Sequence, residues 1–354
     1  MKKKIRVGIL CGGKSAEHEI SLISAKNVIS AIDRNKYEVV VIGIDKEGTW
    51  RFYPDDNFIL NPEDPKAIRL IPHGSIIALI PGKGKRQFLN ISSLQFLKSV
   101  DVVFPVLHGP FGEDGTVQGL LKLIDIPFVG ASVLGSAVGM DKEVTKRLLQ
   151  EAKIPVPKFL VLHKNNADQI NFDLIKKKIR LPLFIKPSNL GSSVGIHKVK
   201  TRNDFRSALK DAFQYDRKIL IEEFIEGREI ECSVLGNEHP IASLPGEIVP
   251  RHEFYSYEAK YLDKDGALLK APAALSPRIV KKVQELAIKT FKTLNCEGMA
   301  RVDFFLRNEQ ELFVNELNTI PGFTKISMYP KLWEISGIPY RELIDRLIQL
   351  ALER

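Results

Sequence analysis

The 354-residue sequence lacks several features that would assign it to a specialised class of protein. Its three cysteines, Cys11, Cys232 and Cys296, are too few for a disulfide framework, and none shares a zinc-ligand spacing with histidine. This cysteine usage is typical of a reducing cytoplasm. No apolar run approaches the roughly 20 residues that a membrane span needs, so we expect no membrane association. The apolar stretch at residues 5–10 is too short for a signal peptide and predicts a first strand.

The charge balance is positive, with 52 Lys and Arg residues against 43 Asp and Glu and a formal net charge of +9. A non-catalytic protein that binds phosphates or nucleic acid through charge would show such a balance. The lysines are scattered, however, and no basic run is interleaved with aromatic residues as a nucleic-acid track would be. We therefore expect no nucleic-acid partner and interpret the charge as a lysine-rich surface.

The length predicts two or three domains, and the composition, 44% hydrophobic and 27% charged, is that of a globular protein. The expected domains are residues 1–130, 131–222 and 223–354. In the first, apolar runs alternate with loops and helical stretches, which indicates an α/β domain with a parallel sheet. Residues 57–86 show too little periodicity to be placed. Helices are expected at residues 16–32, 116–123, 142–152, 204–213, 276–294 and 339–350.

Two apolar strands near the C-terminus, residues 302–306 and 312–317, are joined by a short polar turn, which predicts a hairpin. Folding the hairpin brings Asp303 opposite the end of the second strand, where Glu316 and Asn318 share a face because they are two residues apart. Two carboxylates and a carboxamide are hard oxygen ligands that suit Mg²⁺. The polar, wet face of an ordinary strand pair would show the same pattern.

The first loop raises an alternative function. Residues 8–15, G-I-L-C-G-G-K-S, match the P-loop expression G-x-x-x-x-G-K-S, in which Lys14 would contact phosphates. Gly8 lies within an apolar strand, whereas the first glycine of a P-loop ends its strand, so we regard a P-loop NTPase as the weaker hypothesis. Glu17, on the first turn of the next helix, can instead capture a substrate ammonium group, although a carboxylate there would also complement the helix dipole.

The middle of the chain carries a second loop rich in small residues. Residues 187–195, P-S-N-L-G-S-S-V-G, connect two expected strands, and their size lets backbone N–H groups approach an anion. Lys186 adds a positive charge where the first strand ends. A flexible hairpin tip would have a similar composition. Further on, residues 247–270 form a long polar stretch rich in tyrosine, and a structureless connection of this length predicts a functional lid.

Seven motifs occur in order along nearly the whole chain. They are residues 12–17 (GGKSAE), 108–115 (HGPFGEDG), 140–142 (MDK), 186–195 (KPSNLGSSVG), 257–261 (YEAKY), 301–303 (RVD) and 316–322 (ELNTIPG). Together they resemble the ATP-grasp superfamily and, within it, the D-alanine–D-alanine ligases. The resemblance implies an α/β (α+β) fold of three domains, in which an N-terminal parallel-sheet domain precedes two domains whose antiparallel sheets clasp ATP.

The resemblance also implies a two-step reaction in the cytoplasm for peptidoglycan precursors, carried out by a homodimer. The carboxylate of one D-alanine attacks the γ-phosphate of ATP, and the amine of a second D-alanine then displaces phosphate from the acyl phosphate. Asp303, Glu316 and Asn318 are implied to bind two Mg²⁺ ions, with Mn²⁺ as a substitute. A relative that uses D-serine or D-lactate as second substrate is the alternative.

The remaining residues implied by the resemblance divide between ATP and the amino acids. Lys142 and Lys186 would contact the α- and β-phosphates. Glu222 and the backbone near Ile225 would hold adenine, and Glu229 would hold the ribose.

Around the reacting groups, Arg301 and the Gly322 N–H would stabilise the tetrahedral oxyanion. Ser327 would hold the second carboxylate, and Lys260 the transferred phosphoryl group.

At the first amino-acid site, Glu17 would grip the ammonium group, with His108 nearby. Ser192 and Tyr261 would link Glu17 to the lid, and Tyr261 favours an amine as second substrate.

Overall fold

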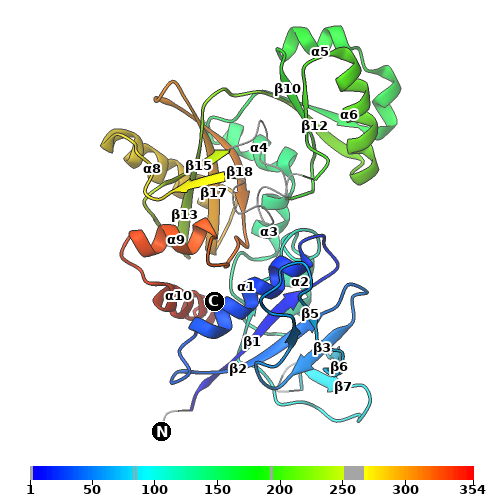
Figure 1. Ribbon diagram of the computed structural model, residues 1–354, viewed down its shortest axis with the longest axis vertical. Coiled ribbons are helices and arrows are strands. Elements are labelled where there is room, and N and C mark those ends of the chain that lie inside the picture. Colours follow the sequence, from blue (N-terminus) through cyan, green and yellow to red (C-terminus); the bar gives the residue numbers. More distant parts are fainter. Residues whose placement is uncertain (1–2, 83, 85, 192–193, 251–266) are drawn as a thin grey trace.

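The structure is a computed structural model that describes residues 3–82, 84, 86–191, 194–250 and 267–354, the side chains at 167–169 and 267 excepted. Three sheets of four to six strands form three α/β units that follow one another along the chain (Figure 1). Each sheet has helices packed on it, which buries the apolar side of its strands. No helix among the described residues is long and apolar enough to cross a membrane.

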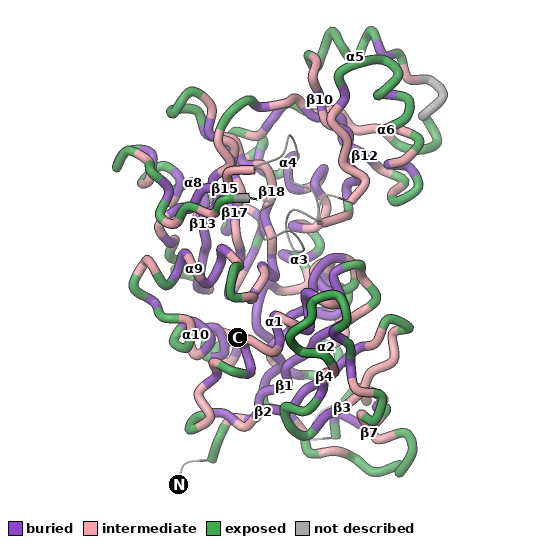
Figure 2. Tube along the Cα trace, in the orientation of Figure 1, coloured by how far each residue is buried: buried purple, intermediate pink, exposed green. Residues whose placement is uncertain are grey.

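The first sheet has the strand order β7-β6-β3-β2-β1-β8. Its β2-β1-β8 half is parallel, as predicted, and these strands are almost entirely buried (Figure 2). The other half is antiparallel and includes β6, which lies in the region that periodicity does not place. Strands of two to five residues are too short for a two-residue alternation to be visible. The strands of this region are β1 (Ile5–Gly12), β2 (Tyr37–Ile44), β3 (Trp50–Tyr53), β4 (Ile59–Leu60), β5 (Arg69–Leu70), β6 (Ser75–Leu79), β7 (Phe88–Asn90) and β8 (Val102–Pro105).

The second sheet is antiparallel, with the order β11-β10-β12-β9. Helices α5 and α6 cover one side, where Phe172 and Phe205 pack edge to face with ring centroids 5.1 Å apart. The strands are β9 (Phe159–His163), β10 (Leu183–Pro187), β11 (His197–Val199) and β12 (Lys218–Glu223). The helices of the chain up to this point are α1 (His18–Ala31), α2 (Thr116–Leu123), α3 (Val133–Met140), α4 (Lys142–Glu151), the 3-10 helix η1 (Lys164–Gln169), α5 (Phe172–Lys178) and α6 (Arg202–Tyr215).

The third sheet has the order β16-β15-β13-β17-β18, with β14 paired to β13, and all its pairings are antiparallel. Its strands are β13 (Arg228–Gly236), β14 (Ile241–Ala242), β15 (Gly246–Pro250), β16 (Ala267–Lys270), β17 (Gly298–Arg307) and β18 (Glu311–Asn318). Helix α8 (Pro277–Thr293) packs on it, with Ser276 as N-cap, as predicted.

The expected structureless lid at residues 247–270 needs correction at both ends. Residues 247–250 belong to β15 and residues 267–270 to β16, and the two strands pair in register from Glu247↔Lys270 to Pro250↔Ala267. Ile248 is buried, and an ion pair of 3.6 Å joins Lys270 to Glu247, so packing outweighs the polar composition there. Residues 251–266 lie outside the described part of the chain.

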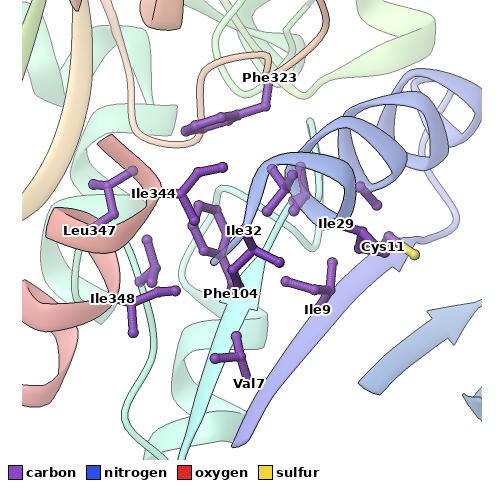
Figure 3. Packing of buried hydrophobic residues seen from close by; sticks show 14 of the residues in the cluster. Val7, Ile9, Cys11, Ile29, Ile32, Phe104, Phe323, Ile344, Leu347 and Ile348 are labelled. Atoms are coloured by element: carbon purple, nitrogen blue, oxygen red, sulfur yellow. The ribbon is translucent and has the colours of Figure 1, made fainter. Parts of the chain in front are cut away.

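The last helices return to the first sheet. Helix α10 (Tyr340–Leu352), which follows α9 (Met328–Ile335), places an apolar face against β8 and α1 and also contacts β13 and β17. Figure 3 shows Ile344, Leu347 and Ile348 packed toward Val7 and Phe104. The core of the first unit is therefore completed by the C-terminal end of the chain.

Candidate functional site

The late hairpin brings its polar residues together as predicted. Asp303 pairs with Glu316 and Arg301 with Asn318, so all four lie on neighbouring positions of β17 and β18. Asn318 Nδ2 donates a hydrogen bond of 3.0 Å to Asp303 Oδ2. Arg301 Nε and Nη2 each donate to one oxygen of Asp303 at 2.7 Å, and Nε also lies 3.1 Å from Glu231 Oε2.

The donor chemistry of this cluster fits Mg²⁺. Asp303, Glu316 and Asn318 offer five hard oxygens on the strand face opposite the core, and the two carboxylates are partly exposed. No group of three or more His, Cys, Asp or Glu among the described residues is arranged to hold a metal, and this cluster combines two carboxylates with a carboxamide. Lys142 Nζ lies 3.5 Å from Glu316 Oε2, so a lysine that is expected to bind phosphates lies beside the candidate metal ligands.

The two predicted phosphate lysines both reach β18. Lys142 begins α4, which Asp141 caps by accepting from the N–H groups of Glu143 and Val144. Lys142 Nζ donates a hydrogen bond to Leu190 O at 2.6 Å, and this bond links the glycine- and serine-rich loop to the candidate metal site. Lys186, at the end of β10, donates to Asn315 Oδ1 at 3.2 Å, one residue before Glu316.

Glu222 occupies an unexpected environment for a residue assigned to adenine. Its carboxylate is 1% exposed and lies between two lysines, with ion pairs of 2.7 Å to Lys146 and 2.5 Å to Lys186. Burial opposes ionisation, but the two lysines hold the pKa of Glu222 below its ordinary value. The side chain of Glu222 therefore forms ion pairs with Lys146 and Lys186. The contacts of Glu222, Ile225 and Glu229 with the nucleoside stay predictions.

The first unit contributes a second polar cluster. Glu17 is the N-cap residue of α1, one position before the predicted first turn, and Ser15 Oγ accepts from its N–H at 3.2 Å. His108 is buried, and its Nδ1 lies 3.0 Å from Ile320 O, just beyond the hairpin. Burial lowers the pKa of His108 and favours the neutral imidazole. Glu17 and His108 thus lie where the first unit meets the end of β18.

Glu113 is a site residue that the sequence analysis missed. It accepts from the Gly109 N–H at 2.7 Å and from the Ile320 N–H at 3.2 Å, which joins the same two parts of the chain as His108. Desolvation, followed by the charge of nearby Glu17, raises the pKa of Glu113 to about 8. Its place in the GEDG motif was the available signal, but its neighbours come from distant segments.

The turn after β18 brings two further predicted residues together. A Cβ at Gly322 would lie 2.7 Å from Ser327 Oγ, so this glycine allows a close approach. Ser327 precedes α9, and its Oγ accepts from the Thr324 N–H at 3.0 Å. Met328, beside it, points into a small core with Ile248 and contributes packing. The predicted residues Ser192, Lys260 and Tyr261 lie outside the described ranges, so their roles stay predictions.

The geometry of the first loop argues against a P-loop. Strand β1 continues to Gly12, which places Gly8 in its middle, where a Cβ would meet Ile42 and Val100 at 3.2 and 3.3 Å. The backbone therefore does not leave the strand at Gly8 to wrap a phosphate. Lys14 is exposed at the far end of the loop, and its side chain lies against Gly48.

Two antiparallel sheets that contribute to a lysine- and carboxylate-lined site, after an N-terminal domain with a mixed sheet, define an ATP-grasp fold. Two family models match the chain, the D-ala D-ala ligase N-terminus over residues 6–131 and the D-ala D-ala ligase C-terminus over residues 148–349. The chain is 56% identical to the D-alanine–D-alanine ligase of Oceanobacillus iheyensis, over 100% of this chain and 96% of that protein. The chain belongs to the D-alanine–D-alanine ligase family.

Solved structures agree with this assignment. The D-alanine-D-alanine ligase from Coxiella burnetii is 42% identical and superposes with a TM-score of 0.85, over 99% of this chain and 94% of that one. The VanG D-Ala:D-Ser ligase from Enterococcus faecalis is 36% identical with a TM-score of 0.86, over 99% of this chain and 100% of that one. Ligases with different second substrates therefore share this backbone.

Proposed function

We propose that this protein is an ATP- and Mg²⁺-dependent ligase that joins two D-alanines into D-alanyl-D-alanine for peptidoglycan precursors. The observation that carries the proposal is the convergence of Asp303, Glu316 and Asn318 on one face, with Lys142 3.5 Å from Glu316. We further propose a cytoplasmic homodimer with domains at residues 1–130, 131–222 and 223–354, and Mn²⁺ as a substitute metal.

The side chains suit phosphoryl transfer, which needs positioning and charge neutralisation more than covalent chemistry. Lys142 and Lys186 would bind the phosphates of ATP, and Asp303, Glu316 and Asn318 would hold two Mg²⁺ ions. Mg²⁺ in this site would neutralise charge on the transferring phosphoryl group. In the first step the carboxylate of one D-alanine attacks the γ-phosphorus, and the bond to the β-phosphate oxygen breaks, which leaves ADP and D-alanyl phosphate.

The second step is an acyl transfer. Glu17, next to buried His108, would hold the ammonium group of the first D-alanine, while the amine of the second attacks the acyl carbon and phosphate leaves. Arg301 and the Gly322 N–H would stabilise the oxyanion of the tetrahedral intermediate. Ser327, at the N-terminus of α9, would bind the second carboxylate, where the helix dipole favours a negative charge.

A product assay tests the substrate assignment. Purified protein with ATP, Mg²⁺ and D-alanine should release equal amounts of phosphate and dipeptide, identified by mass spectrometry. D-serine and D-lactate, each offered together with D-alanine, should be poorer second substrates. Phosphate release only with D-serine or D-lactate present would show a ligase with that second substrate; VanG is by its title a D-Ala:D-Ser ligase.

A substitution at the metal site tests the chemistry. Glu316→Ala removes one of the two carboxylates of the proposed metal site and should lower kcat by at least about 10³-fold. Lys14→Ala is the matched control, because Lys14 is exposed and its side chain lies against Gly48, and it should retain activity. Full turnover by Glu316→Ala, or loss of turnover in Lys14→Ala alone, would contradict the proposed site.

A further inference from the structure

Strand β18 contains a β-bulge directly before the candidate metal ligand Glu316. Asp303 pairs with Glu316, but the next residue of β17, Phe304, pairs with Val314. Asn315 is therefore an extra residue without a position opposite it on β17. Such a residue shifts the alternation of the side chains that follow it.

The bulge decides which face of the sheet Glu316 occupies. Side chains alternate along a strand, so in a regular β18 Glu316 would follow Val314 into the core. With the extra residue, Leu317 takes the next core position and is 4% exposed, in line with Val314 at 0%. Glu316 and Asn318 move to the opposite face, beside Asp303. The candidate metal site therefore requires the bulge.

Two lysines from other elements contact the bulge residue. Lys146 Nζ, from α4, donates to the carbonyl oxygen of Asn315 at 3.0 Å. Lys186 Nζ, from β10, donates to the Asn315 side-chain oxygen at 3.2 Å. Both lysines also pair with Glu222 of β12, at 2.7 and 2.5 Å. The four residues form a closed ring that joins β18 to the second sheet and to α4.

Lys146 differs from the phosphate lysines in its burial. Its side chain is 1% exposed, whereas those of Lys142 and Lys186 are 10% and 8% exposed and each borders the proposed ATP site. It lies one helical turn after Lys142, so both lysines project from the same side of α4. Lys146 is too enclosed to touch a substrate, and its polar partners are Glu222 and the bulge.

We propose that Lys146 and Asn315 are positioning residues that hold the β18 bulge, and thereby keep Glu316 and Asn318 on the metal-binding face and Lys186 directed at the phosphates. This inference rests on the proposed function. Lys146 fixes the bulge carbonyl, and the Asn315 carboxamide fixes Lys186. The expected consequences are separate: Lys146 governs the affinity for the metal, and Asn315 governs the affinity for ATP.

Lys146→Met tests the first consequence, since methionine keeps most of the length of the side chain but donates no hydrogen bond. Mn²⁺ binding in the presence of ADP, followed by electron paramagnetic resonance, should weaken at least about tenfold. The Mg²⁺ concentration for half-maximal velocity should rise by a similar factor, while the KM for the first D-alanine stays unchanged. Unchanged Mn²⁺ binding in folded Lys146→Met would overturn the inference.

Asn315→Leu tests the second consequence and carries the test if Lys146→Met does not fold. Leucine keeps the volume and the backbone carbonyl but removes the acceptor for Lys186. The KM for ATP should rise several-fold with little change in Mn²⁺ binding, and an unchanged KM would contradict the proposed role. Failure of the ligase proposal is distinguishable, because the unsubstituted protein would then make no dipeptide.

A stability control separates positioning from a general loss of packing. Leu347→Ala leaves a cavity in the core that α10 shares with the first sheet, where Leu347 is fully buried. It should lower the melting temperature and leave the Mn²⁺ affinity at its original value. If Leu347→Ala and Lys146→Met weaken Mn²⁺ binding equally at equal loss of melting temperature, the effect of Lys146 is structural only and the inference fails.

Discussion

Single residues at the meeting point of the first unit and the hairpin carry a pH dependence that can be measured. Glu113 has an ordinary pKa near 4.5 when unfolded and about 8 in the folded protein, so the folded state binds more protons between these values. Its contribution to the free energy of unfolding is complete below pH 4.5 and is lost as the pH rises to 8. The loss is at most about 1.4 kcal/mol per pH unit.

Glu113→Gln should remove this slope, because glutamine does not titrate. Thermal unfolding of both proteins at half-unit steps from pH 5 to 8.5 measures the difference. Glutamine also loses one acceptor for the Gly109 or Ile320 N–H, so the variant should be less stable throughout. The same slope in both proteins would show that Glu113 is ionised in the folded state.

At this scale, the residues predicted correctly are those whose geometry depends on short spacings. Glu316 and Asn318 share a face because they are two positions apart along the strand. The bulge at Asn315, which sets Asp303 opposite Glu316, is not visible in the sequence. Lys146 and Glu113 were missed because their partners lie on other elements, up to 207 residues away in the sequence. The burial of Glu222 between Lys146 and Lys186 is likewise a tertiary property that the sequence does not show.

Elements with strong local signals form as predicted, and α4 shows why. Asp141 accepts from the N–H groups of Glu143 and Val144 and from Ser188 Oγ, and it pairs with Lys218 at 2.6 Å. These bonds outweigh burial and hold the pKa of Asp141 below its ordinary value. The cap therefore stabilises α4 above the ordinary pKa and weakens as acid protonates Asp141.

Two substitutions separate the cap from its charge. Asp141→Asn keeps the side-chain acceptor for the helix N–H groups, whereas Asp141→Ala removes it and should cost about 1 kcal/mol more. Thermal unfolding at pH 7 gives the difference, and activity reports whether Lys142 at the first turn keeps its place. Equal stability of the two variants would show that the Lys218 ion pair, and not the cap, holds this turn.

Elements without such signals were missed or misjudged. Strands β4 and β5 have two residues each and no visible period, and α3 is too apolar all round to show one face. The ends of the expected lid are paired strands because Ile248 packs against Met328. The local pattern of residues 247–270 does not predict this contact. Local propensity is overridden wherever a distant segment supplies the packing.

At the scale of the whole molecule, the core of the first unit contains residues from both ends of the chain. Ile344, Leu347 and Ile348 share one buried core with residues of β1 and β8, more than 200 residues away in the sequence, and with Trp333 of α9. The sequence predicts that α10 is an amphipathic helix. It does not predict which sheet this helix covers, because an apolar helix face can pack against many different apolar surfaces. The first unit and the candidate site are thereby joined through one core.

This shared core predicts cooperative behaviour. Leu347→Ala should lower the free energy of unfolding by about 2–5 kcal/mol, because it leaves a cavity among fully buried side chains. Hydrogen exchange followed by mass spectrometry should then show faster exchange in β1 and β8 as well as in α10, while β10 and β12 of the second unit keep their protection. Faster exchange in α10 alone would mean that the helix opens independently of the first sheet. The first sheet, whose following loops carry Glu17 and His108, would in that case be stable without the C-terminal helix, and the coupling between the two ends of the chain would be absent.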